Sequence, residues 1–293
     1  MDTVQNDNAI YQQAKQTAYI SFSLLLCTYR NDNPEHLEEC IKSMLSQTKF
    51  PCEAIIVKDG KLTPALDEVI AKSVFPCETN IITLQTNQTL GLARAAGVKA
   101  AKHDWIALMD SDDIAVPDRF EKQLAEIAKD PNVSIVGGQI AEFIDAPVGE
   151  MPIRSVPTSH DEILIRAKKR NPFNAMTVMF RRDLALQAGN FRRFPGFEDY
   201  DLWMRMIKKG AVCANCQEVL VQARIGNGLY SRRSGFGYIL NEWRMQRTLY
   251  HLKITNTVEF VRNVLTRIPV RLLPKKWLKW AYVRFGGRVV VHE

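Results

Sequence analysis

Three carboxylates within four positions follow an apolar run near the middle of the sequence. The run at 105–109 predicts a buried strand, and Asp110, Ser111, Asp112 and Asp113 come directly after it. Carboxylates this close repel one another, so we expect them to share a cation. Mg²⁺ or Mn²⁺ suits them, because these hard cations favour carboxylate oxygens and commonly share their coordination shell with substrate phosphates. The alternative is a polar turn in which Asp113 or a neighbouring residue caps the next helix.

A second acidic pair, Glu198 and Asp199, stands immediately before a segment with helical periodicity. A carboxylate whose pKa is lifted by partial burial can accept the proton of an attacking hydroxyl, so this pair could supply a general base. The alternative is structural. Asp199 would then cap a helix that begins near Tyr200, and Glu198 would interact favourably with the helix dipole.

Alternating strands and helices are expected to position these groups. Apolar runs predict strands at 20–27, 53–58, 80–85 and 105–109, and amphipathic spacing predicts helices that begin at Pro34, Pro64, Leu92 and Pro117. Such strongly apolar strands are typical of a parallel sheet that is covered on both faces. Ligands of these sheets bind beyond the carboxyl ends of the strands. Thr28, Arg30 and Asp59 should therefore converge with the central carboxylates on one site.

The regular alternation weakens beyond residue 133. Short strands are predicted at 133–136 and 176–180, with a long polar connection between them. No internal repeat or Gly/Ser-rich linker marks a second domain before about residue 230. We expect a polar lead-in at 1–19, one α/β domain at 20–230 and an extension at 231–293.

Composition limits the class of protein. Hydrophobic residues make up 46% of the 293 residues, enough for a substantial core, and no apolar stretch is long enough for a membrane span. Residues 1–8 are polar and lack the order of a signal peptide, so we expect a cytoplasmic protein. Cys213 and Cys216 have the spacing of half a zinc site, but no second pair completes it.

The basic charge is concentrated at the C-terminal end. Residues 231–293 hold thirteen Lys/Arg and three Asp/Glu, whereas the whole chain has a net charge of +7. Basic residues mixed with Trp and Leu suit the surface of an anionic membrane. The alternative is a pair of helices that pack on the domain and expose a basic face. Arg232 and Arg233 could contact a pyrophosphate or lie in a solvated turn.

The ordered set of motifs resembles the family 2 glycosyltransferases of the GT-A fold over about residues 20–245. The resemblance is carried by five segments: Thr28-Tyr-Arg30, Val57-Lys-Asp59-Gly60, Ala93-Arg94-Ala-Ala-Gly97, Asp110-Ser-Asp-Asp113 and Gly196-Phe-Glu-Asp-Tyr-Asp-Leu-Trp203. It implies a Rossmann-like α/β fold with a mixed sheet flanked by helices, followed here by a basic helical C-terminal extension.

The same resemblance assigns roles to the residues. A UDP-sugar would be the donor, held by Thr28, Arg30, Asp59, Arg94, Asp110 and Ser111. Asp112 and Asp110, the Asp-x-Asp motif, would bind Mn²⁺ or Mg²⁺. Asp199 would be the general base of an inverting transfer, and Glu198 would orient the acceptor.

A narrower resemblance connects the chain to enzymes of amylovoran and O-antigen biosynthesis. It rests on the segments at 33–37, 171–180 and 224–235, and implies transfer of a hexose, with galactose favoured, to an undecaprenyl-diphosphate-linked sugar at the inner face of the membrane. Two departures matter, since Ala175 and Gly226-Asn227 stand where related enzymes carry histidine. A metal would then rely on Asp112, Asp110, the diphosphate and water.

Other functions remain open from the residues alone. A phosphatase or phosphotransferase could use Asp110 as nucleophile, although such enzymes place the motif after the first strand rather than the fourth. A non-catalytic subunit that binds nucleotide sugars is a second alternative. Nucleic-acid binding is not expected, because no recognised motif accompanies the basic tail.

Overall fold

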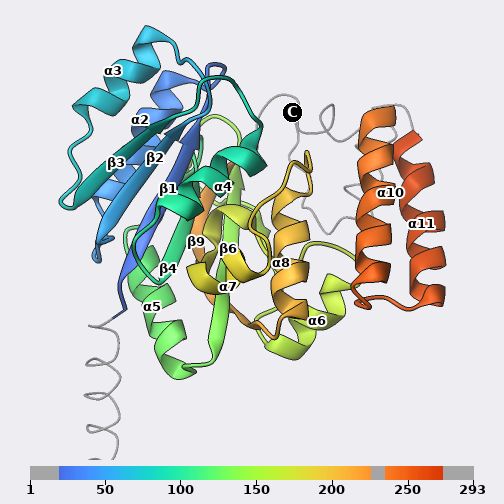
Figure 1. Cartoon of the computed structure of the whole chain (residues 1–293). Helices are drawn as coiled ribbons and strands as arrows, with labels where there is room; N and C mark the ends of the chain where they lie inside the picture. The colour runs from blue at the N-terminus through green and yellow to red at the C-terminus, as the bar shows by residue number, and fades with distance from the viewer. Residues whose placement is uncertain (1–19, 226–234, 273–293) are drawn as a thin grey trace, which may run out of the picture.

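A computed structural model describes residues 20–225 and 235–272 of the chain. Its centre is one mixed sheet in the order β3-β2-β1-β4-β8-β6-β9-β5, with β7 paired to β6 (Figure 1). The strands are β1 (Phe22–Thr28), β2 (Glu53–Lys58), β3 (Glu78–Thr83), β4 (Trp105–Asp110), β5 (Ile114–Ala115), β6 (Val133–Phe143), β7 (Ile153–Arg154), β8 (Met179–Arg181) and β9 (Val212–Arg224).

Helices cover the sheet and extend beyond it (Figure 1). They are α2 (Pro34–Leu45), α3 (Pro64–Lys72), α4 (Leu90–Ala100), α5 (Arg119–Lys129), α6 (His160–Ala167), α7 (Arg182–Gln187), α8 (Glu198–Lys208), α10 (Phe236–His251) and α11 (Thr257–Leu272), with a 3₁₀ turn, η1, at Ala175–Thr177. The predicted α/β class with a mixed sheet flanked by helices is confirmed.

The first four strands in the order β3-β2-β1-β4 are parallel, as predicted. Leu24 and Leu26 of β1 face one side of the sheet, toward α2, α3 and α5, whereas Leu25 and Cys27 face the other, toward α4 and α8. Burial on both faces explains the continuous apolar runs of these strands. Their carboxyl ends therefore meet at one edge of the sheet.

The second half of the sheet is mixed. β8 pairs antiparallel with both β4 and β6, and β9 runs parallel to β6. The strand predicted at 176–180 begins instead with the 3₁₀ turn η1, because Thr177 turns its hydroxyl inward to donate to Asn174 O and to accept from Gly138 N. Only Met179–Arg181 then remain extended.

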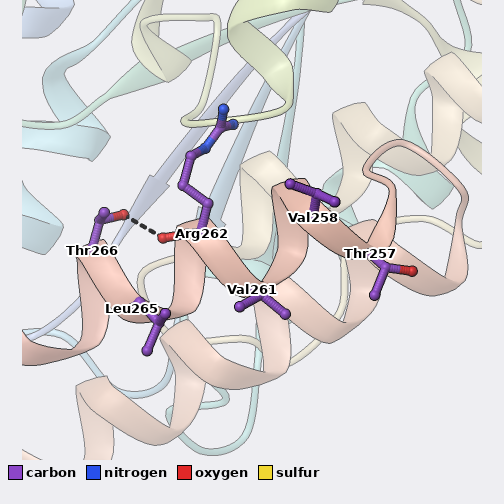
Figure 2. Close-up of a pocket in the computed structure, with 6 residues that line it drawn as sticks. All are labelled: Thr257, Val258, Val261, Arg262, Leu265 and Thr266. Carbon is purple, nitrogen blue, oxygen red and sulfur yellow. Dashed lines mark hydrogen bonds between the residues drawn. The ribbon is translucent and has the colours of Figure 1, made fainter.

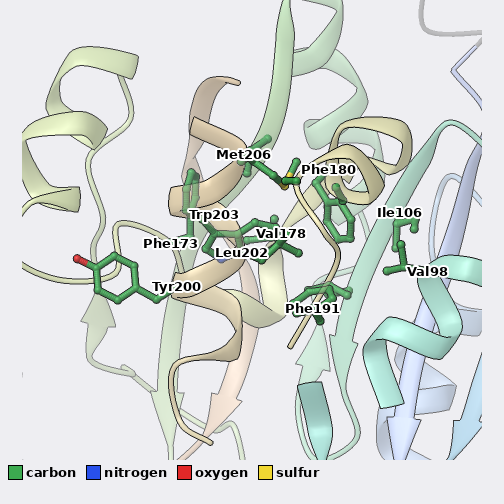
Figure 3. Packing of buried hydrophobic residues seen from close by; sticks show 14 of the residues in the cluster. Val98, Ile106, Phe173, Val178, Phe180, Phe191, Tyr200, Leu202, Trp203 and Met206 are labelled. Atoms are coloured by element: carbon green, nitrogen blue, oxygen red, sulfur yellow. The ribbon is translucent and has the colours of Figure 1, made fainter. Parts of the chain in front are cut away.

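A cluster of aromatic side chains fixes α8 to the sheet (Figure 3). The Trp203 ring lies 5.3–6.1 Å from the rings of Phe173, Phe180 and Phe191, measured between centroids. All four side chains are buried. Aromatic contacts of this kind hold α8 in a fixed position against the sheet. They also fix the position of the acidic residues in the first turn of α8.

The helices α10 and α11 lie side by side at one end of the domain (Figure 1). Met245 and Leu249 of α10 belong to the same buried cluster as Trp203, so α10 packs directly on the domain. Within 20–225 and 235–272, no helix is both long and apolar enough to cross a bilayer. Arg232, Arg233 and the Trp- and Lys-rich stretch at 273–293 lie outside the described residues.

Four of the six cysteines are buried, and all six are free. Cys52 is exposed and Cys77 is partly exposed. These two residues precede β2 and β3, whose register pairs Glu53 with Glu78, so both lie at the amino ends of the strands. The pair Cys213 and Cys216 is buried in β9.

Candidate active site

The ends of β1 and β4 meet through Asp32, a residue that the motif analysis missed. Its Oδ2 accepts hydrogen bonds from Thr28 Oγ1 at 2.8 Å, Ser111 Oγ at 2.8 Å and Tyr29 N at 3.1 Å. Burial raises the pKa of Asp32, although these hydrogen bonds act in the opposite direction. Thr28 and Ser111 are thus brought together as expected, and Arg30 is exposed just beyond the strand end.

Asp59, at the end of β2, organises the loop before α4. Its two carboxylate oxygens accept from the backbone N–H groups of Gln88 at 2.6 Å and Thr89 at 3.2 Å. The next residue, Gly60, has a φ of +89°, and a Cβ there would lie 2.8 Å from Asn87 N. A carboxylate oxygen has a second lone pair, so Asp59 retains the capacity to accept a nucleobase N–H.

A buried ion pair joins α4 to the central strand. Arg94 Nη2 lies 2.5 Å from Asp110 Oδ1, and the Arg94 side chain is only 4% exposed. Burial lowers the pKa of Arg94, but the carboxylates of Asp110 and Glu198 outweigh it, so the net shift is upward. The resemblance places Arg94 among the residues that would hold the UDP-sugar; in this structure its guanidinium is directed at Asp110 and acts electrostatically on Glu198.

The remaining central carboxylates differ in exposure. The Asp112 residue is exposed, and its backbone oxygen accepts from Arg224 Nε at 3.2 Å. Asp113 is buried, and its Oδ1 accepts from the Arg224 backbone N–H at 2.8 Å. Its Oδ2 has no hydrogen-bond partner within 20–225 and 235–272. Burial, and then the charges of Asp112 and Asp110, raise the pKa of Asp113 well above its usual range.

One structural alternative for Asp113 is wrong. The next helix, α5, begins at Arg119 with Asp118 as its N-cap, so Asp113 does not cap it. Asp113 instead fastens the acidic turn to the end of β9 through Arg224. Proximity in sequence suggested the cap, whereas the actual partner lies 111 positions away.

A divalent cation fits this edge of the sheet. Among the described residues no three His, Cys, Asp or Glu side chains are gathered into a ready-made metal site. Mg²⁺-type sites in phosphate-transfer chemistry need only one or two carboxylates, because substrate phosphates and water complete the shell. Asp110, at the end of β4, and Asp112, two residues later, supply such a pair.

The second acidic pair lies in the first turn of α8. The helix begins at Glu198 with Phe197 as its N-cap, so the idea that Asp199 caps a helix from Tyr200 is wrong. Asp199 Oδ2 accepts from Asn171 Nδ2 at 2.9 Å, and its Oδ1 accepts from the Tyr200 backbone N–H at 2.8 Å. Asn171 therefore orients the carboxylate that the resemblance assigns as the base, a contact that sequence spacing alone did not reveal.

Glu198, like Asp199, is half-buried. Its Oε2 is buried and has no hydrogen-bond partner among the residues that the structure describes. Burial, then the charge of Asp199, raise the pKa of Glu198 to about 7, while Arg94 acts in the opposite direction. The carboxylates of Asp110, Glu198 and Asp199 all raise the pKa of Arg94, so this arginine couples the central carboxylates electrostatically to the pair on α8.

Comparison with known proteins places this site in context. Residues 23–189 match the family model described as Glycosyl transferase family 2. The chain belongs to glycosyl transferase family 2. It is 34% identical to the amylovoran biosynthesis glycosyltransferase AmsE of Erwinia amylovora over 261 residues, which cover 89% of this chain and 97% of AmsE.

The chain is also similar in sequence to a second enzyme, and in fold to a solved structure. The chain is 34% identical to the UDP-Gal:alpha-D-GlcNAc-diphosphoundecaprenol beta-1,3-galactosyltransferase of Escherichia coli, over 89% of this chain and 94% of that enzyme. The structure also resembles the mannosyltransferase PcManGT from Pyrobaculum calidifontis, solved with GDP-Man and Mn²⁺. The TM-score is 0.59 at 13% identity, with 98% of this chain and 86% of that chain covered.

These findings confirm the predicted family, the GT-A fold and the glycosyltransferase class. They favour a glycosyltransferase over the phosphatase or phosphotransferase that the isolated Asp-x-Asp motif had left open. Of the two positions where histidine was expected, Ala175 lies in the 3₁₀ turn η1, and Gly226-Asn227 lies outside the described residues. The individual roles of the site residues are proposals.

The raised pKa of Glu198 predicts a pH-dependent stability difference between wild type and Glu198→Gln. Between the ordinary value of 4.5 and about 7, the unfolded chain has lost this proton and the folded chain has kept it. Wild-type stability should therefore fall as pH rises through this range. The Tm of Glu198→Gln minus that of wild type should increase from about pH 4 to about pH 7 and then level off. A Tm difference that stays constant across the range would contradict the shift.

Proposed function

We propose that this family 2 glycosyltransferase transfers a hexose, most simply galactose from UDP-galactose, to a sugar on a lipid diphosphate during bacterial surface-polysaccharide assembly. The observation that carries the proposal is the 34% identity, over 89% of the chain, to the E. coli galactosyltransferase whose name states this reaction. AmsE, at the same identity, belongs to amylovoran biosynthesis and supports the same class of product.

The donor would occupy the carboxyl edge of the sheet. Thr28, Arg30, Asp59 and Ser111 are the candidates for the nucleotide, and Asp112 with Asp110 would hold Mn²⁺ or Mg²⁺. A bound divalent cation stabilises negative charge on a departing diphosphate. Arg94, buried beside Asp110, would also stabilise the negative charge on the diphosphate. Its cation lies in a region of low dielectric, where electrostatic interactions are strong.

The acceptor would lie on the α8 side of Arg94. Asp199, held by Asn171, would accept the proton of the attacking sugar hydroxyl, and Glu198 would help to orient that sugar. Attack opposite the leaving group inverts configuration, so an α-linked donor yields a β-linked product. No protein nucleophile is needed for this single displacement.

We also propose that the C-terminal helices bring the enzyme to the inner face of the membrane. α11 exposes three apolar side chains at helical spacing, with Val258 77% and Leu265 66% exposed, and Val261 between them (Figure 2). Arg262 lies beside them, and residues 231–293 carry thirteen Lys/Arg against three Asp/Glu. Apolar residues next to basic ones suit an anionic lipid surface.

One assay tests both proposals. Purified full-length protein with UDP-galactose, Mn²⁺ and a GlcNAc-diphosphate-lipid should release UDP and form a β-linked disaccharide, identified by NMR coupling at the new linkage. With the acceptor in vesicles, anionic lipid should accelerate transfer and retain the protein on sedimentation. Val261→Asp/Leu265→Asp should lose this advantage but keep activity on a soluble short-chain acceptor.

The outcomes separate the alternatives. Binding of UDP-galactose without any UDP release would favour a non-catalytic nucleotide-sugar-binding subunit. Transfer of another sugar from a panel of UDP-sugars would correct the choice of galactose and leave the reaction class intact. Equal sedimentation with neutral and anionic vesicles would refute the membrane proposal alone.

A further inference from the structure

The last residue of β9, Arg224, contacts three separate segments of the chain. Its Nε donates to Asp112 O at 3.2 Å, its Nη1 donates to Asp145 O at 2.7 Å, and its Nη2 lies 2.5 Å from Glu39 Oε2. These partners belong to the acidic turn at 110–113, to the segment after β6 and to α2. One guanidinium thus joins segments that lie 79 to 185 positions away along the chain.

The guanidinium of Arg224 is buried and packed against an aromatic ring. The Arg224 side chain is 8% exposed, and its Cζ lies 4.6 Å from the centroid of the buried Phe143 ring. The three hydrogen-bonded partners each use a different nitrogen, a geometry that the planar fork of arginine provides and the compact ammonium of lysine does not. Two of these partners are backbone oxygens, so the side chain fixes the course of the chain.

The second half of the acidic turn is attached to the end of β9 at two points. The side chain of Arg224 holds Asp112 O, and its backbone N–H donates to Asp113 Oδ1 at 2.8 Å. The next backbone N–H, that of Ile225, donates to Phe143 O at 2.7 Å and fixes the end of β9 against the end of β6. Asp112 itself is exposed, so the buried arginine supports the backbone of an exposed carboxylate.

We propose that Arg224 is a positioning residue for the metal ligand Asp112. The inference rests on the proposed function, in which Asp112 and Asp110 hold Mn²⁺ or Mg²⁺, and adds a residue that supports this pair. A cation that demands near-ideal octahedral geometry needs ligands in defined positions. Arg224 acts through the backbone of Asp112 and does not itself bind the metal or the donor.

Metal binding in the absence of turnover tests this assignment. Free Mn²⁺ is titrated by electron paramagnetic resonance into full-length protein that contains UDP but no acceptor. For Arg224→Gln, the Kd for Mn²⁺ should rise about 10- to 100-fold, the range for groups that orient a metal ligand. The Kd for UDP without metal should stay at the wild-type value, and saturating Mn²⁺ should restore most of kcat.

Two further variants divide the contacts of the guanidinium. Arg224→Lys keeps the charge beside Glu39 but lacks the fork, so it should recover only part of the Mn²⁺ affinity. Glu39→Gln removes the ion pair and leaves both backbone contacts in place. Its Kd for Mn²⁺ should stay within about fivefold of wild type, because the Glu39 side chain is 52% exposed and exposed ion pairs contribute little.

Arg182 provides a matched control for a general loss of stability. Its Nε donates to Val98 O at 3.0 Å and its Nη2 donates to Lys99 O at 3.1 Å, so it too holds two backbone oxygens. Its backbone N–H donates to Asp104 O, next to the first residue of β4 and at the opposite edge of the sheet from the acidic turn. Arg182→Gln should lower the Tm and leave the Kd for Mn²⁺ unchanged.

Each remaining outcome has a definite meaning. An equal loss of Mn²⁺ affinity in Arg182→Gln and Arg224→Gln would show a general effect on folding and overturn the proposal. Wild-type Mn²⁺ affinity in Arg224→Gln, with a loss in Asp112→Asn, would refute the inference and leave the metal site intact. Wild-type protein that binds no Mn²⁺ with UDP would refute the metal site and the inference together.

The lysine variant decides the question if Arg224→Gln does not fold. A Kd for Mn²⁺ in Arg224→Lys that exceeds the wild-type value, with an unchanged Kd for UDP without metal, would support the positioning role. Equal Mn²⁺ affinity in Arg224→Lys and wild type would then refute it.

Discussion

Asp199→Asn should lower kcat about 10²- to 10⁴-fold, the range expected when a general base is lost. Asparagine keeps the size of aspartate and can still accept the hydrogen bond from Asn171, but it cannot take a proton from the acceptor hydroxyl. The Kd for the UDP-sugar should remain nearly unchanged, because the proposed donor contacts lie at the strand ends. Single-turnover kinetics together with calorimetric donor binding measure the two quantities separately.

A matched variant controls for the helix dipole. Asp183→Asn removes an exposed carboxylate from the first turn of α7, a position that is equivalent along its helix but belongs to a different element. Its kcat should equal that of wild type. Activity of Asp199→Asn within about threefold of wild type would rule out Asp199 as the general base, because general-base catalysis contributes at least about 10²-fold. An α-linked product from an α-linked donor would also exclude the inverting mechanism.

Asp112→Asn should abolish most turnover at limiting Mn²⁺ and weaken metal binding by at least about 10- to 100-fold, the loss typical even of groups that only support a metal ligand. Asp112 is exposed, so its replacement should not alter the Tm by more than the change usual for a surface site. High Mn²⁺ should restore part of the rate. Electron paramagnetic resonance of free Mn²⁺ in the presence of UDP gives a readout that does not depend on activity.

Asp118→Asn is the control for Asp112. This carboxylate lies at the start of α5 and pairs with Lys122 at 2.8 Å, outside the strand-end group. Its loss should leave the Mn²⁺ titration unchanged. If Asp112→Asn shows wild-type activity at limiting Mn²⁺, the assignment of Asp112 to the metal is wrong.

The parallel half of the fold was predictable because its signals are local. The strand predicted at 105–109 is β4, Trp105–Asp110, and the strand predicted at 53–58 has those bounds in the structure. Asn33 accepts from Glu35 N and Pro34 opens α2, as their sequence positions indicated. In each case an apolar run or a cap residue encodes the element within a few positions.

The mixed half was less predictable because its polar residues are satisfied by distant partners. The strand predicted at 133–136 continues as β6 to Phe143, past the polar Gln139. The side-chain amide of Gln139 donates a hydrogen bond to Cys216 O at 2.8 Å and accepts one from Val156 N at 2.6 Å. These hydrogen bonds allow the polar Gln139 side chain to be buried. No pattern around residue 139 reveals those partners.

The candidate site divides in the same way. Strand-end position identified Asp110 and Asp59 from spacing alone. Asp32 and Asn171 were not predicted as site residues, because their importance lies in contacts with Ser111 and Asp199, 79 and 28 positions away. Asp32 could have been found from its place four residues after Thr28, within hydrogen-bond reach of the same strand end.

The distribution of the cysteines makes this protein convenient for spectroscopic labelling. Thiolates react with maleimides, and burial raises the pKa of Cys27, Cys213 and Cys216 to about 12, which keeps them protonated. Cys52 is exposed at the amino end of β2, the opposite edge from Asp110. A fluorophore on Cys52, with Cys77 replaced by serine, would report rotational tumbling in solution and on vesicles without blocking the edge of the sheet that carries Asp110.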